Sequence, residues 1–163
     1  MPLLENGRIA EDPWQVVADD APLPDAPAII SLERLQREAA ALAGRNAPLG
    51  VAIGNEVNPD ALAPFLPRLA LVQVQLPKPR DGRAFTQVRA LREYHGFGGE
   101  IRVAGHVIAD HYAMLLRCGA SSVVVPEGAS PAVWEASRKV VGIAYQHAQG
   151  ASQPLALLRR KVA

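Results

Sequence analysis

The sequence contains a single cysteine, Cys118, so it can form no disulfide within the chain and no four-cysteine zinc site. It also has no apolar run that approaches the ~18 residues needed to span a bilayer. The first residues lack the basic stretch and the long apolar core of a signal peptide. We therefore expect a cytoplasmic protein that does not enter a membrane.

Charge of one sign is not in excess, because 17 Lys and Arg residues stand against 16 Asp and Glu residues. A formal net charge of +1 creates no global field that would attract nucleic acid or an anionic membrane, so we expect neither partner. With 49% hydrophobic residues the chain is apolar enough to fold. Its 163 residues suit one domain with a sizeable core.

Motifs for nucleotides and for nucleophilic hydrolysis are also missing. No Gly-x-Gly-x-x-Gly follows a predicted strand, and no Gly-x-Ser-x-Gly is present. The glycines at 96–99 follow a helical pattern, which is the wrong context for a dinucleotide site. One cysteine cannot ligate a four-cysteine iron–sulfur cluster. We therefore expect no resident cofactor.

Short apolar runs alternate with amphipathic stretches from residue 28 onward. Strands are predicted at 28–30, 49–53, 69–76, 100–104 and 121–125. Helices are predicted at 32–42, after Asn58-Pro59, and at 83–95, 109–118 and 131–147. This alternation predicts one α/β domain over residues 1–163, with a mainly parallel sheet of about five strands flanked by helices. A Rossmann-like sheet and a partial β/α barrel both fit.

The remaining segments frame these βα repeats, which occupy residues 28–149. Asn6-Gly7 between two apolar runs predicts a β-hairpin within residues 1–17. Three prolines predict an extended connection over residues 18–27. The tail, residues 150–163, can add one short element.

Functional side chains concentrate in residues 78–83, a loop between a predicted strand and a predicted helix. Ligands of parallel sheets bind at the carboxyl ends of the strands, where this loop lies. Three cations beside a glycine and a helix N-terminus favour an anion site. Surface ion pairs and a helix cap at Asp81 are the structural alternative. The candidate anion- or partner-binding residues are Lys78, Arg80, Asp81, Gly82, Arg83, Gln87, Arg92 and Arg102.

Histidine and cysteine offer weaker signals. His106, Asp110 and His111 form a local group, but no clear further ligand comes from another part of the chain. We therefore expect no metal site. Cys118 ends a predicted helix, whereas a helix N-terminus would stabilise its thiolate. We therefore expect Cys118 to act as a small buried residue, and catalytic residues remain unknown.

The loop and its surroundings resemble a known family. The stretch LPKPRDGRAFTQ at 76–87, with 91–94, 99–108 and 117–119, resembles the signature of the bacterial DUF934 family. The resemblance covers most of the chain. Pro79 stands where an aromatic residue is common in the family, and His106 and His111 stand where Asp and Gln are usual.

The resemblance implies a role in sulfite reduction, because family members are described as oxidoreductases of that pathway. Two functions follow. The first is an accessory or binding protein of assimilatory sulfite reduction, in sulfate assimilation and cysteine biosynthesis, whose partner is sulfite reductase or another sulfate-assimilation enzyme. The alternative is an oxidoreductase or transferase that acts on sulfite or a related small anion. Enzymatic activity and a homodimeric state are left open.

Overall fold

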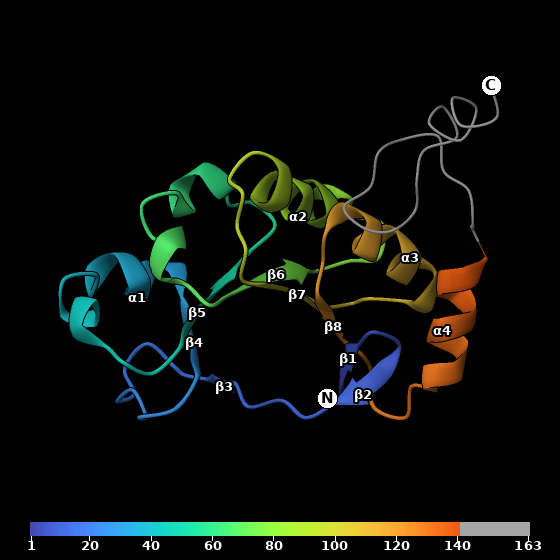
Figure 1. The fold of residues 1–163 in the computed structure, drawn as a ribbon, viewed down its shortest axis with the longest axis horizontal. Helices are drawn as coiled ribbons and strands as arrows, with labels where there is room; N and C mark the ends of the chain where they lie inside the picture. The colour runs from blue at the N-terminus through green and yellow to red at the C-terminus, as the bar shows by residue number, and fades with distance from the viewer. Residues whose placement is uncertain (141–163) are drawn as a thin grey trace, which may run out of the picture.

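The computed structural model describes residues 1–140, which form a curled eight-stranded sheet covered by helices (Figure 1). The strands are β1 (Leu3–Glu5), β2 (Arg8–Ala10), β3 (Gln15–Val16), β4 (Ala28–Ser31), β5 (Leu49–Ile53), β6 (Leu71–Leu76), β7 (Glu100–Gly105) and β8 (Ser122–Val124). The helices are α1 (Leu32–Arg37), α2 (Arg83–Glu93), α3 (Ala109–Cys118) and α4 (Pro131–Lys139), with 3-10 turns η1 (Ala41–Gly44), η2 (Pro59–Leu62) and η3 (Leu66–Arg68). The predicted α/β class is confirmed.

The strands lie in the order β2-β1-β8-β7-β6-β5-β4-β3. From β3 to β8 each strand pairs in parallel with the next one along the chain. This order has no reversal point of the kind that defines a doubly wound sheet, and it matches the order of strands within a β/α barrel. Right-handed crossovers then place successive helices on one face, as α1, α2 and α3 show in Figure 1.

The prediction of about five mainly parallel strands was wrong in number and in kind. The five predicted strands correspond to β4–β8, but three N-terminal strands join the same sheet, and the antiparallel pairs of β1 with β2 and β8 make it mixed. The predicted hairpin is present, with positive φ at Asn6 (49°) and Gly7 (77°), and its strand β1 pairs antiparallel with β8. Pairing across more than a hundred residues leaves no trace in local periodicity, so the sequence pattern could not predict it.

Two predicted helices are shorter than expected. The stretch 32–42 divides into α1 and the turn η1, and the segment after Asn58 forms only η2 and η3. Pro64 and Pro67 interrupt that segment, because proline removes a helical donor and clashes with the preceding turn. Helices α2 and α3 lie where they were predicted. The predicted extension of the last helix to His147, and the tail 150–163, lie outside the described residues.

The two faces of the sheet are covered differently. On the helical face, Val72, Val74 and Leu76 of β6 are fully buried in one core with residues of the helices. On the opposite face, the segment between β2 and β3 crosses the strands. There, Arg102 Nη1 donates to Asp12 Oδ2 at 2.8 Å. No helix among residues 1–140 is both long enough and apolar enough to cross a membrane.

Candidate functional site

The loops that follow β5 and β6 meet at the carboxyl edge of the sheet. Asn55 Nδ2 donates to Asp81 Oδ2 at 2.5 Å and so joins the two loops. Gln87 Nε2, from the second turn of α2, donates to the carbonyl oxygens of Gly54 at 2.8 Å and Val57 at 2.7 Å. These contacts hold the loop after β5 against the start of α2.

Asp81 organises the loop 78–83, called the cationic loop below. The Arg83 guanidinium donates to it twice, from Nε at 3.0 Å and from Nη2 at 2.7 Å, and the Arg83 backbone N–H donates at 3.2 Å. These hydrogen bonds, chiefly those from the side chain, lower the pKa of Asp81 to about 2. Asp81 therefore accepts a hydrogen bond from the first amide of α2, one residue before the N-cap Gly82, and neutralises the charge of Arg83.

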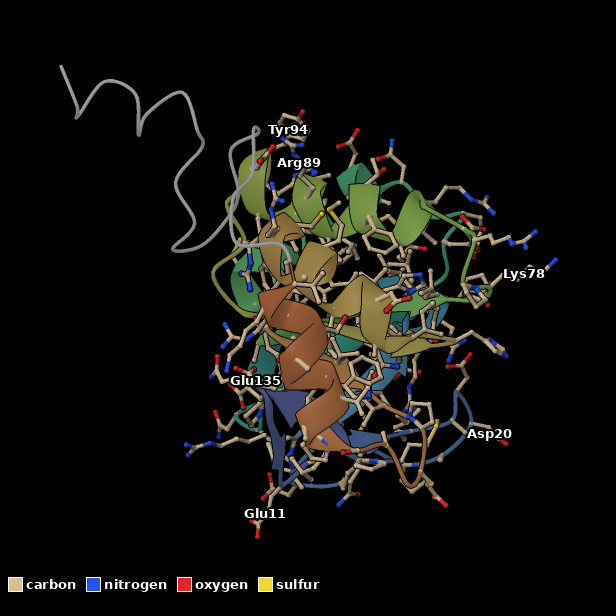
Figure 2. All side chains as sticks on the ribbon, turned by 90° about the vertical axis from the view of Figure 1, so that its right-hand side faces the viewer. Glu11, Asp20, Lys78, Arg89, Tyr94 and Glu135 are labelled. Carbon is tan, nitrogen blue, oxygen red and sulfur yellow. The ribbon has the colours of Figure 1, made fainter. Side chains whose placement is uncertain are left out.

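Lys78 and Arg80 are left unpaired. Both side chains are exposed, and neither makes a hydrogen bond or an ion pair with any residue of the described part of the chain. Figure 2 shows Lys78 projecting outward from the edge of the molecule. The cationic loop therefore presents two free positive charges next to one that is already neutralised.

Gly82 and Gln87 are the two uncharged residues among those predicted to form the site. Gly82 precedes α2 with an ordinary φ of −72°, and a side chain there would meet open space, so the backbone does not require glycine. Gln87 is buried, with 4% of its surface exposed, and its amide nitrogen is used by backbone carbonyls. Gln87 therefore holds the loop after β5 against α2 and is not one of the exposed charged groups of the cationic loop.

Arg92 and Arg102 were also predicted as site residues, and the structure does not bring them to the cationic loop. Arg92 lies at the other end of α2 and donates to the carbonyl oxygens of Phe97, Gly99 and Gly119. Arg102 lies on the sheet face opposite the helices, where 2% of it is exposed, and also donates to Glu100 at 3.0 Å. Both arginines connect segments of the fold.

His106, His111 and Cys118 lie in α3 or just before it. His106 is exposed, while His111 packs edge-on against the ring of Phe85 with 5.4 Å between ring centroids. Burial lowers the pKa of His111 and raises the pKa of the half-buried Cys118. Within residues 1–140, no group of three His, Cys, Asp or Glu side chains is placed to hold a metal ion.

Sequence reasoning missed Asn55 as a member of this site. It follows a buried strand and directly precedes Glu56, whose charge also raises the pKa of Arg83. A polar residue at the carboxyl end of a parallel strand was the available signal. Its partner, Asp81, could not be identified without knowing that β5 and β6 are neighbours.

Comparison with protein-family models shows the family of the chain. A family model described as "Bacterial protein of unknown function (DUF934)" matches residues 50–156. The matched region contains Asn55, the cationic loop and the whole of α2. A search of curated proteins finds no match to the chain.

Proposed function

The chain belongs to the DUF934 family, and we propose that it is an accessory protein of assimilatory sulfite reduction that docks on an acidic surface of its partner through the cationic loop. The partner is sulfite reductase or another enzyme of sulfate assimilation. The place in this pathway rests on the resemblance at 76–87 and its neighbouring stretches, because proteins with that signature are described as taking part in sulfite reduction.

One observation carries the docking role: Lys78 and Arg80 are exposed and unpaired in a chain whose charges otherwise nearly cancel. A local excess of positive charge on a neutral protein acts on a complementary partner without attracting polyanions in general. Such charges steer encounter and fix the orientation of the bound partner.

The loop geometry favours a protein surface over a small free anion. Lys78 and Arg80 lie on open surface, where water and salt screen a single small ion strongly. The first amide of α2 already donates to Asp81, so the helix N-terminus does not offer that group to a ligand. An extended acidic surface can contact both cations at once and exclude water from them.

Growth on sulfate as sole sulfur source tests the proposal in cells. A strain in which the gene is deleted should grow poorly, and the wild-type gene should restore its growth. The double variant with Lys78→Ala and Arg80→Ala should restore growth much less. Added cysteine should rescue every strain. The matched control is Arg8→Ala, because Arg8 is likewise exposed and unpaired among the described residues but lies in the N-terminal hairpin. Full restoration by the double variant, or normal growth of the deletion strain, contradicts the proposal.

A further inference from the structure

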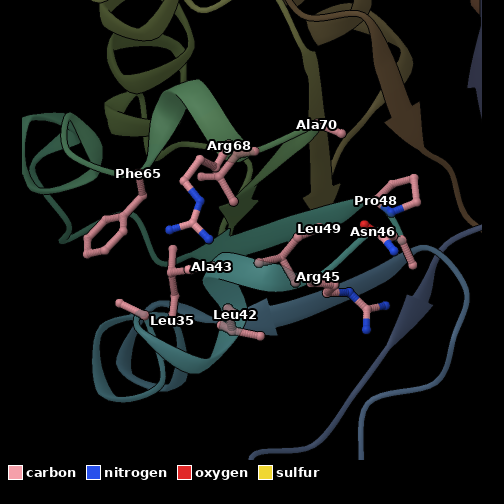
Figure 3. A pocket seen from close by; sticks show the side chains of 13 residues that line it. Leu35, Leu42, Ala43, Arg45, Asn46, Pro48, Leu49, Phe65, Arg68 and Ala70 are labelled. Carbon is pink, nitrogen blue, oxygen red and sulfur yellow. The ribbon is translucent and has the colours of Figure 1, made fainter.

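Figure 3 shows a pocket of about 330 Å³, called the cavity below. It lies where β5 and β6 begin, at the end of the sheet opposite the cationic loop. It opens to solvent and is lined by residues of α1, η1 and η3 and by the segments that lead into β5 and β6. The cationic loop follows the far end of β6, whose six residues span about 20 Å. The cavity is therefore separate from the proposed docking surface.

As far as residues 1–140 line it, the wall of the cavity is apolar on most sides and carries no negative charge. Its larger apolar side chains are Leu35, Leu42, Leu49, Phe65 and Leu69. The only charged residues in the lining are two arginines, and neither Asp nor Glu is among them. A ligand with an apolar body and a negative charge fits such a wall better than a cation does.

Of the two arginines in the lining, Arg68 is the one whose guanidinium faces the cavity. Its guanidinium points toward Ala43 and Phe65 across the mouth of the cavity (Figure 3). Arg68 is exposed, like the cations of the loop, but it lies beside an apolar wall that can hold the body of a ligand. Its side chain makes no hydrogen bond or ion pair within the described residues, so its donors are free. Two parallel N–H groups of a guanidinium match the two oxygens of a carboxylate.

Arg45 plays a different part in the same wall. Its Nη2 donates to the carbonyl oxygens of Pro24 at 2.7 Å and Ala26 at 2.6 Å, which fixes the proline-rich connection beside η1. Its Nε is buried and has no partner. Arg45 therefore adds a fixed positive charge beside the cavity, while its guanidinium is directed away from Arg68 (Figure 3).

We propose that this cavity binds a small organic monocarboxylate, with its apolar body against Leu35, Leu42 and Phe65 and its carboxylate on Arg68. The volume supports this size of ligand. An apolar cavity of about 150 Å³ holds one benzene ring, so 330 Å³ holds a ring with a short side chain. The volume also lies at the lower end of the range for small-molecule sites, which begins near 300 Å³.

Isothermal titration calorimetry with 3-phenylpropanoate tests the proposal, with the neutral 3-phenylpropanamide as the matched ligand. We expect saturable binding of the acid and binding of the amide weaker by at least about tenfold. Arg68→Gln should weaken binding of the acid by a similar factor. Arg8→Gln, which changes an exposed arginine of the hairpin, should leave the affinity unchanged.

A second variant tests the cavity itself. Ala43 is exposed at the cavity wall, so Ala43→Phe fills the space without removing a core side chain, and it should abolish binding while Arg68 remains. Equal affinity for the acid and the amide, unchanged affinity in Arg68→Gln, or no binding of the acid to the wild-type protein overturns the proposal. None of these results bears on docking through the cationic loop, which the growth test examines separately.

Discussion

At the scale of single residues, a few buried side chains fasten segments that are far apart in the sequence. The Tyr112 hydroxyl, in α3, accepts the Gly7 backbone N–H at 2.9 Å and so holds the N-terminal hairpin. Arg102 reaches Asp12 across the other face of the sheet. The residue types at these positions were visible in the sequence, but contacts across about a hundred residues have no local pattern, so their roles could not be predicted.

Removing the Tyr112 hydroxyl should destabilise the fold measurably. Tyr112→Phe leaves the Gly7 N–H without its acceptor, which should cost about 1 kcal/mol in free energy of unfolding. The measurement is urea denaturation followed by circular dichroism. Tyr94→Phe is the control, because Tyr94 is 80% exposed and its substitution should change stability by less than about 0.5 kcal/mol. Equal effects of the two substitutions would contradict the role assigned to Tyr112.

The carboxyl group of Asp81 offers a test by pH. Its pKa of about 2 comes chiefly from the Arg83 side chain, so Arg83→Ala should raise the pKa toward the ordinary value near 4. A lowered pKa stabilises the folded state at pH values above the ordinary pKa. That contribution is lost as the pH falls through about 2.

Carbon-detected NMR titration of the Asp81 carboxyl follows this pKa directly. Lys78→Ala serves as the control, because the Lys78 side chain makes no hydrogen bond or ion pair with Asp81 and its loss should leave the midpoint almost unchanged. A midpoint for Asp81 that stays near 2 in Arg83→Ala would show that another group holds the carboxylate ionised.

At the scale of helices, strands and loops, capping residues predicted individual helix ends correctly, whereas some whole elements were predicted wrongly. Ser31 caps α1 by accepting the Arg34 N–H at 3.0 Å, and Gly119 ends α3 with a φ of 107°, as the sequence indicated. The helix predicted after Asn58 does not form as an α-helix, because its prolines leave only two 3-10 turns. The two-residue strand β3 is too short to have a period and was missed.

Arg92 shows how one side chain can connect several elements. It donates to carbonyl oxygens before β7 and at the end of α3, and to Ser121 Oγ at 2.8 Å. Arg92→Ala should therefore lower the free energy of unfolding by about 2–3 kcal/mol, since it leaves these acceptors without their donor.

The matched control for this prediction is Arg89→Ala on the same helix. Arg89 is 45% exposed and makes an ion pair with Glu93 at 2.7 Å, so its loss should cost only about 0.3–0.5 kcal/mol. Chemical denaturation of both variants makes the comparison. A loss of stability in Arg92→Ala no larger than in Arg89→Ala would contradict the connecting role.

At the scale of the whole molecule, the order of strands separates two surfaces of different chemistry. The carboxyl edge of the sheet carries the cationic loop, and the opposite edge carries the apolar cavity beside Arg68. The cationic loop could be located from the sequence, because three cations follow an apolar strand. The cavity could not, since its wall combines α1, η1 and η3, which meet only in the folded chain.

Binding of the purified chain to sulfite reductase, measured by calorimetry over a range of salt concentrations, tests the docking proposal most directly. We predict an affinity that falls as salt rises, because exposed charges form the contact. The double variant Lys78→Ala, Arg80→Ala should bind about tenfold more weakly, which corresponds to about 1.4 kcal/mol, with a smaller salt dependence and unchanged stability. Arg8→Ala should bind like the wild type. Equal affinity and equal salt dependence of the wild type and the double variant would contradict docking through this loop.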